Sequence, residues 1–241
     1  MRCAITQPTF LPWLGWFDLI DTVDVVVLLD TVQFEKRSWQ QRNRLKTTTG
    51  LKFLTVPVQS AGRFEQKIHE VRIADDFSSA SILGKIKNSY CDAPYFGNIF
   101  KQLKVIFEDT SSGDKLLSLN LQLIEYFAYK LNVTTPLIKA SEMKVVGKRG
   151  EYLANICSEI GADTYVSTLG ARDYLLEDLQ YFVNNNIDVF LYEYESQIYP
   201  QLHTPFESMA SVLDLVMMVG PNSGQIMRSG LRMLTELTCN R

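Results

Sequence analysis

Five consecutive apolar residues, Val25-Val26-Val27-Leu28-Leu29, run directly into Asp30. A strand that is apolar at every position is typical of a parallel sheet with helices on both faces, because alternate side chains point to opposite faces. Before this run come a short strand candidate at 2–6, a loop with two prolines, and a helical apolar stripe at 13–21. Strand, helix and buried strand in this order predict a βαβ unit with a right-handed crossover.

Strands and helices are predicted to alternate along the rest of the chain, which favours an open, mostly parallel sheet. The further strands are predicted at 53–58, 68–73 (as an edge strand), 137–139, 164–167 and 189–192. Helices are predicted at 79–91, 96–108, 115–131, 150–160, in a stretch that ends near 185, at 209–219 and at 223–238. The stretch 31–50 is rich in charge and shows no periodicity, so it is predicted to be a loop.

The expected fold class is therefore α/β: a Rossmann-like, mostly parallel sheet with flanking helices and an added helical lobe. The 241 residues contain no internal repeat, low-complexity tract or linker, so a single domain over 1–241 is predicted. The three consecutive helices between 79 and 131 could form a side lobe of that domain.

Charge and cysteine usage restrict the class of protein. The net charge of −3 argues against a general nucleic-acid coat, so an anion-binding role must come from a local cluster. No run of about eighteen apolar residues occurs, so no membrane insertion is expected, and the N-terminus lacks the apolar core of a signal peptide. The four cysteines are widely separated and form no paired motif, which fits a reducing cytosol. A cytoplasmic location is predicted.

The loop that follows the first strand is the first candidate site. In parallel sheets, ligands bind outside the carboxyl ends of the strands, where helix N-termini present free N–H groups. Two prolines stiffen this loop, and Gln7, Pro12 and Trp13 are its candidate binding residues. The alternative is a tight strand-to-helix turn closed by an aromatic core residue.

The segment 30–46 is the second candidate, because it gathers five cations at the end of the buried strand. Arginine presents a planar fork that matches phosphate or carboxylate, and an aromatic ring such as Trp39 could stack on a base or a sugar. A solvated charged loop is the alternative, but the interleaved aromatic and amide residues favour function. The candidate ligand residues are Gln33, Lys36, Arg37, Ser38, Trp39, Arg42, Asn43, Arg44 and Lys46.

Two later segments add candidates. Around 165–174 a strand ends in hydroxyl residues and a glycine, so Ser167 and Gly170 could bind an anion; helix capping is the alternative. Around 199–214 a pocket could be lined by Tyr199, Gln201, Ser211 and Asp214, although Ser211 and Asp214 also suit the start of a helix.

The sequence predicts no metal site and identifies no cofactor. His69 and His203 are the two histidines, and neither has a partner at ligand spacing. No phosphate-binding loop, dinucleotide fingerprint or paired-cysteine signature is present.

Taken together, these segments resemble the WbqC-like family. The matching positions are 7–8, 11–15, 17–18, 30, 32–34, 36–40, 42–44, 46 and 55–58, followed late in the chain by 161–162, 164–165, 167, 170–171, 174, 199–201 and 211–215. Gln41 departs from the pattern, which favours a residue closer to Asn, and the middle helices match less clearly. The resemblance implies a role in bacterial surface polysaccharide (O-antigen) synthesis and, by analogy with some members, glycine or aminoacyl transfer.

The leading hypothesis is an acyl- or aminoacyl (glycine-type) transferase that acts on the amino group of a nucleotide-linked sugar. The basic segment would bind the phosphates, and Trp39 would stack on the base or the sugar. Asp30, at a strand end, is the candidate general base, because deprotonating an ammonium nucleophile needs a positioned acceptor. The expected partners are an anionic small molecule and an acyl or aminoacyl donor, with nucleic acid limited to a tRNA carrier.

Two alternatives stay open. The opening topology is similar to nucleotidylyltransferases of the HIGH type, which favours an ATP-dependent nucleotidyl-transfer or ligase enzyme. However, Trp13-Leu14-Gly15-Trp16 stands where the histidines of that family would be sought. The other alternative is a non-enzymatic ligand-binding or scaffold subunit of a glycan-synthesis assembly.

Overall fold

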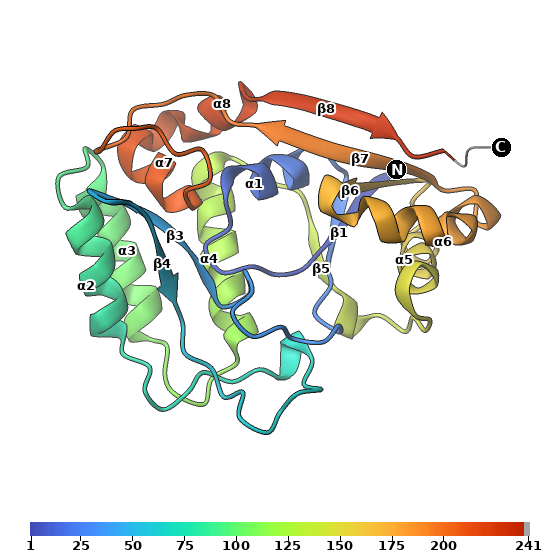
Figure 1. Cartoon of the computed structure of the whole chain (residues 1–241), viewed down its shortest axis with the longest axis horizontal. Coiled ribbons are helices and arrows are strands. Elements are labelled where there is room, and N and C mark those ends of the chain that lie inside the picture. The colour runs from blue at the N-terminus through green and yellow to red at the C-terminus, as the bar shows by residue number, and fades with distance from the viewer. Residues whose placement is uncertain (239–241) are drawn as a thin grey trace.

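The computed structural model describes residues 1–238, and its main feature is a six-stranded sheet of order β5-β2-β1-β6-β7-β8 (Figure 1). All neighbouring pairs are parallel except β7 and β8, which are antiparallel. The predicted α/β fold with a mostly parallel sheet is confirmed. The strands are β1 (Arg2–Thr6), β2 (Val25–Leu28), β5 (Leu137–Lys139), β6 (Thr164–Thr168), β7 (Asp188–Glu195) and β8 (Leu231–Glu236).

Helices cover the sheet and form the added lobe. Within residues 1–238 the α-helices are α1 (Leu14–Asp21), α2 (Ser79–Tyr90), α3 (Phe96–Glu108), α4 (Leu116–Leu131), α5 (Arg149–Glu159), α6 (Arg172–Asn184), α7 (Val212–Val219) and α8 (Ser223–Arg228). In Figure 1, α5 and α6 lie together at one end of the molecule, and α2, α3 and α4 lie toward the other end with α7 and α8 above them.

Strand β2 shows why its sequence is apolar at every position. Val26 and Leu28 belong to a hydrophobic cluster that includes residues of α1, α4 and α7. Val25 and Val27 belong to a second cluster, formed with α5 and α6 on the opposite face of the sheet. Because alternate side chains of a strand point to opposite faces, both sets are buried and neither face can be polar.

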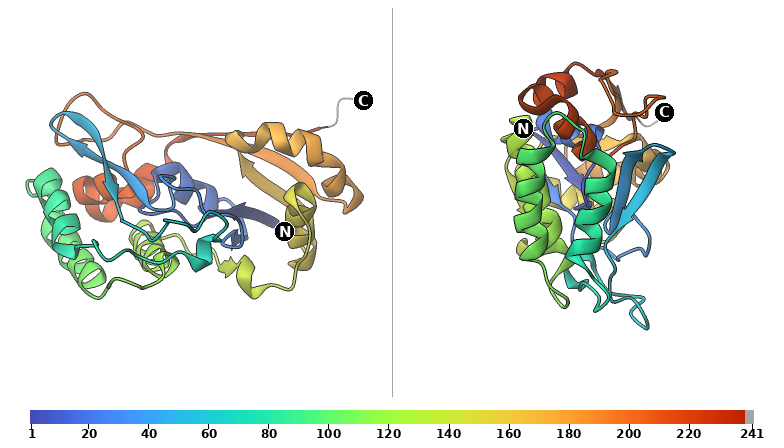
Figure 2. Two further views of the ribbon diagram at one scale, coloured as in Figure 1. Left: turned by 60° about the horizontal axis from the view of Figure 1, so that its bottom comes forward. Right: turned by 90° about the vertical axis from the view of Figure 1, so that its left-hand side faces the viewer.

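A β-hairpin occupies the second half of the segment that was predicted to be a loop. Strand β3 (Arg42–Thr47) pairs with β4 (Gly50–Thr55) in a separate two-stranded sheet beside α2 (Figure 2). The loop prediction for 31–50 is therefore wrong from Arg42 onward. A strand with one buried face normally alternates apolar and polar residues. In β3 the buried positions include Asn43 as well as Leu45, so the alternation does not show in the sequence.

Two other predicted elements are also wrong. The segment 68–73 is not an edge strand: Ile68–Glu70 is a single 3₁₀ turn, followed by isolated bridges. The helix predicted at 223–238 ends at Arg228, and β8 follows it. The residues of β8 suit a helix locally and are all exposed, so its conformation is set by pairing with the edge of β7.

Candidate functional site

The strand order creates a crevice at the carboxyl edge of the sheet. Strand β1 lies between β2 and β6, so the chain leaves β1 toward β2 on one side and later returns on the other side as β6. The loops that follow β1 and β6 therefore diverge. In open α/β sheets, the crevice between two such loops is the usual ligand site.

A cavity of about 290 Å³ lies at this crevice, and we call it the switch-point cavity. Its wall is built from the loop after β1, the start of α1, the hairpin with the loop before it, and the end of β6. The lining residues are Thr9, Trp13, Trp16, Trp39, Asn43, Arg44, Thr168 and Met209. The structure thus brings together residues from all four segments that the sequence singled out, the last of them through Met209.

The hairpin side of the cavity carries an alternating set of cations and aromatic rings. The guanidinium of Arg44 lies 5.1 Å from the ring centre of Trp39, and that of Arg42 lies 4.1 Å from the ring centre of Phe53. Trp39 is 45% exposed and Phe53 is 48% exposed, so part of each ring is open to a ligand. Nε of Arg44 is buried and has no hydrogen-bond partner within residues 1–238.

The loop side of the cavity is fixed by short-range contacts. A Cβ at Gly15 would lie 2.3 Å from the Trp13 ring, so glycine is what lets that ring lie against α1. The buried amide of Asn43 donates to the carbonyls of Phe10 (3.2 Å) and Leu11 (2.8 Å). Asn43 therefore ties the hairpin to the loop after β1 and holds the two walls of the cavity together.

The turn after β6 contributes through Thr168 rather than Ser167. Ser167 is buried, and its hydroxyl accepts from Tyr165 at 3.1 Å. Gly170 lines an adjoining cavity of about 300 Å³ that shares Trp13, Trp16 and Thr168 with the switch-point cavity. Arg44 of the basic segment and Thr168 at the end of β6 thus line one cavity.

The remaining residues of the first two candidate segments lie around the cavity without lining it. Gln7 accepts from the amide of Gln40 at 2.6 Å, and the carbonyl of Pro12 accepts from the backbone N–H of Val212 at 2.9 Å. Ser38 donates to Gln40 at 2.6 Å. Lys36 and Arg37 are exposed on the loop before the hairpin.

The predicted binding residues of the late segment belong to a buried polar cluster behind the hairpin and do not line the switch-point cavity. Asp214 accepts from the hydroxyl of Tyr199 at 2.8 Å and from the amide of Gln201 at 2.7 Å, both on Oδ2. Lys46 is fully buried, and its Nζ donates to the carbonyl of Pro205 at 2.5 Å. The backbone N–H of Ser211 donates to the carbonyl of Arg44 at 2.9 Å. The cluster thus supports the strand that presents Arg44 to the cavity.

Burial sets the protonation of this cluster. Desolvation raises the pKa of Asp214 above its ordinary value, against the opposing effect of its hydrogen bonds from Tyr199, Gln201 and Tyr90 and of the Lys46 charge. Burial also raises the pKa of Tyr90 and Tyr199 well above that of a free phenol, and the Asp214 charge adds to both shifts. The two phenols therefore stay protonated and act as donors.

Asp30, the predicted general base, is completely buried. Its carboxylate accepts from the backbone N–H of Ser141 at 2.8 Å and from the Ser141 hydroxyl at 2.6 Å. Its main-chain carbonyl accepts from both the backbone N–H of His69 (3.0 Å) and the ring Nδ1 of His69 (2.9 Å). In this geometry Asp30 joins the ends of β2 and β5 and orients His69.

A larger cavity, of about 830 Å³, lies at the carboxyl ends of β2 and β5, and we call it the β2–β5 cavity. Of the predicted ligand residues it includes Gln33. Sequence reasoning missed His69, since that residue was assigned to an edge strand, and passed over the loop around Lys148. The lining residues are Thr31, Val32, Gln33, Lys67, His69, Ala140, Ser141, Met143, Val145, Gly147, Lys148, Arg149 and Tyr152.

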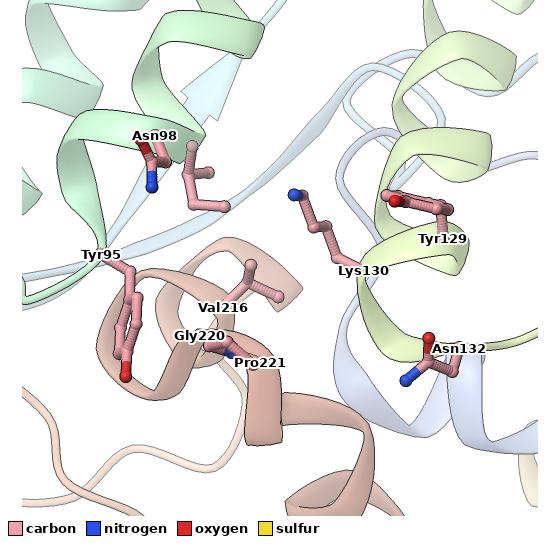
Figure 3. Close-up of a pocket in the computed structure, with 9 residues that line it drawn as sticks. Tyr95, Asn98, Tyr129, Lys130, Asn132, Val216, Gly220 and Pro221 are labelled. Atoms are coloured by element: carbon pink, nitrogen blue, oxygen red, sulfur yellow. The ribbon is translucent and has the colours of Figure 1, made fainter.

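A further cavity, of about 290 Å³, lies among α3, α4 and the turn after α7 (Figure 3). Lys130 extends into it from α4, Asn98 and Tyr95 face it from the other side, and Asn132 lies where α4 ends. It contains none of the predicted ligand residues. Because Asn132 precedes β5, this cavity lies away from the carboxyl edge that carries the other cavities.

Comparisons with known proteins add the family and one relative. The model of the WbqC-like protein family matches residues 7–226. The uncharacterized protein Rv1507c of Mycobacterium tuberculosis (strain ATCC 25618 / H37Rv) is 35% identical over 228 residues, which cover 94% of this chain and 97% of that protein. No solved structure is significantly similar. None of the helices within residues 1–238 has the length and apolar character that a membrane span requires.

Proposed function

The chain belongs to the WbqC-like protein family, and from that premise we propose that it is an acyl- or aminoacyl-transferase acting on the amino group of a nucleotide-linked sugar in bacterial surface polysaccharide synthesis. The observation that carries the proposal is the pairing of Arg44 with Trp39 on the wall of the switch-point cavity. This pairing places a cation for phosphate and a plane for a ring side by side.

The chemistry of this wall suits a sugar nucleotide. The planar guanidinium of arginine binds phosphate oxygens in a forked geometry. Aromatic side chains stack on nucleobases, at about 1–3 kcal/mol per base. The half-exposed Trp39 ring, which lines the cavity, offers such a plane.

The size of the site suits part of such a ligand at a time. At about 290 Å³ the switch-point cavity is near the lower end for small-molecule sites, typically about 300–1,000 Å³. The adjoining cavity of about 300 Å³ shares three of its lining residues. A ring and its phosphate would fill one cavity, and the second sugar would extend into the other.

The first test is calorimetric titration of a UDP-linked amino sugar into the wild-type protein and into Trp39→Ala and Arg44→Ala. We expect each substitution to weaken binding about tenfold or more, because a stacking or a charged contact is lost. Phe64→Ala is the matched control: Phe64 is an exposed aromatic residue that does not line the cavity. Equal affinities in all four proteins would contradict the assignment of the cavity.

Transfer itself is tested separately, by mass spectrometry of the sugar nucleotide after incubation with glycyl-tRNA, acyl-CoA, or ATP and glycine. A mass increase equal to the acyl group supports the proposal and identifies the donor. Tight binding with no product under any of these conditions would assign the protein to ligand binding alone. The Asp30→Asn variant tests the predicted base: if it retains full turnover, Asp30 has no part in proton transfer.

A further inference from the structure

The β2–β5 cavity is lined by positive charge in a protein whose net charge is −3. Lys67, Lys148 and Arg149 line it, and none of its thirteen described lining residues is a carboxylate. Arg149 is already engaged with Glu177 at 2.7 Å. Lys67 and Lys148 form no ion pair within residues 1–238. Two cations at this cavity are thus available to a ligand.

His69 has a fixed orientation in the same cavity. A carbonyl oxygen can only accept, so Nδ1 of His69 must carry the hydrogen in its 2.9 Å contact with the carbonyl of Asp30. The neutral ring therefore keeps Nε2 unprotonated, and the charged ring makes it a donor. Nε2 has no hydrogen bond within residues 1–238. The nearby Glu70 carboxylate accepts from the backbone N–H of Lys67 at 2.7 Å.

A pair of hydroxyls adds a further donor. The side-chain oxygens of Thr31 and Tyr152 lie 2.9 Å apart, and both residues line the cavity. Whichever hydroxyl donates to the other, the accepting hydroxyl keeps its own hydrogen for another acceptor. The cavity thus offers two ammonium groups, one hydroxyl hydrogen and an oriented imidazole. The first two groups can bind a phosphate oxygen directly, and the imidazole can do so when its ring is charged and Nε2 carries a hydrogen.

We propose that the β2–β5 cavity is a second ligand site, which binds the phosphate groups of a phosphate ester or diphosphate through Lys67, Lys148 and His69. This proposal does not rest on the proposed function of the switch-point cavity, because no lining residue is shared between the two. At about 830 Å³ the site is large enough for a ligand of nucleotide size. The carboxyl edge of the sheet would then hold two anionic ligands.

The two histidines allow a direct test in solution. The full-length protein is labelled with ¹³C and ¹⁵N at histidine, and the signals are assigned with His203→Gln. At about pH 8, where a free imidazole is mostly neutral, the ¹⁵N spectrum of His69 should show the Nδ1–H tautomer. On titration with inorganic pyrophosphate, the ring Cε1–H signal of His69 should move and saturate, while that of His203 stays in place. An Nε2–H tautomer, or an unsaturated drift of both histidines, would overturn the site.

Charge variants complete the test. Lys67→Ala and Lys148→Ala should each weaken the pyrophosphate affinity measured at His69 by about tenfold. Lys144→Ala is the matched control, since Lys144 is exposed in the same loop but does not line the cavity. If all three variants bind like the wild type, the lysines are not ligands and the proposal fails. A saturable response to acetate and none to pyrophosphate would also overturn it, in favour of a carboxylate.

Discussion

Asp18 and Asp214 are both completely buried, yet their carboxylates are balanced in different ways. Arg232 donates to both oxygens of Asp18, from Nε at 2.8 Å and from Nη2 at 2.5 Å, and the Tyr192 hydroxyl adds a third hydrogen bond. Asp214 forms no ion pair within residues 1–238, and the Lys46 charge acts on it without a direct contact. It accepts from Tyr199 and Gln201 on one oxygen, and its Oδ1 has no hydrogen-bond partner within the described part of the chain.

The difference shows what each cluster does for the structure. The Asp18 cluster joins α1 to the edge strand β8, whose other side chains are exposed, so a strong charged contact holds an element that has little core of its own. The Asp214 cluster lies behind the hairpin, and the hydrogen bonds to its carboxylate come from neutral groups. Burial raises the pKa of Asp214, so the stability that its cluster contributes depends on pH.

Asp18→Ala should have the largest effect on stability. It leaves the Arg232 guanidinium and the Tyr192 hydroxyl without their partner, and breaking a buried ion pair costs about 3–5 kcal/mol. Because Arg232 is 35% exposed and can regain water, we expect about 3 kcal/mol. Urea denaturation followed by circular dichroism measures the loss.

Asp21→Ala is the control for this prediction. Asp21 also accepts two hydrogen bonds from one arginine, Arg228, at 2.7 and 2.8 Å, but it keeps 17% of its side chain exposed. Because Asp21 is less desolvated than Asp18, we expect Asp21→Ala to lower the free energy of unfolding by only about 1 kcal/mol. Equal losses in the two variants would show that burial does not set the value of these pairs.

Asp214→Asn should have a smaller effect that depends on pH. The pKa of Asp214 is raised in the folded protein by burial, so its stabilising contribution is complete below the ordinary aspartate pKa and is lost as pH rises through the folded value. The free energy of unfolding of the wild type minus that of the variant should therefore fall with rising pH, by at most about 1.4 kcal/mol per pH unit. Urea titrations between about pH 4 and pH 8 measure this difference. A difference that rises with pH would mean that the fold favours the ionised carboxylate.

The sequence predicts the sheet better than it predicts the site. Strand β2 and the helices around it can be predicted from local patterns alone. A strand that is buried on both faces must be apolar at every position, and this run is easy to identify. The hairpin and β8 were mistaken because long-range contacts decide them. Asn43 is buried by bonds to a loop 32 and 33 residues away, and β8 is ordered by β7.

The candidate site could be predicted in part. The strand-end rule marked the loop with Trp13 and the segment with Trp39 and Arg44 as candidates, and the structure brings all three residues to the switch-point cavity. The same reasoning treated Tyr199 and Asp214 as pocket residues, whereas they lie behind the hairpin. Polar residues in a motif give no sign of which side of a strand they will occupy, since a buried network and a binding site use the same side chains.

Tyr199→Phe should have the smallest effect and sharpens the comparison most. The substitution removes one donor to Asp214, while Gln201 still donates at 2.7 Å and the ring can keep its edge contact with Phe206, 5.1 Å between centroids. Loss of one hydrogen bond in a shared network costs about 1 kcal/mol, which urea denaturation resolves. Tyr192→Phe is the counterpart at Asp18, where Arg232 alone still balances the charge, and its cost should be no larger. A loss of about 3 kcal/mol or more in Tyr199→Phe would mean that one hydroxyl, not a set of dipoles, keeps Asp214 buried, and the distinction between the two carboxylates would then fail.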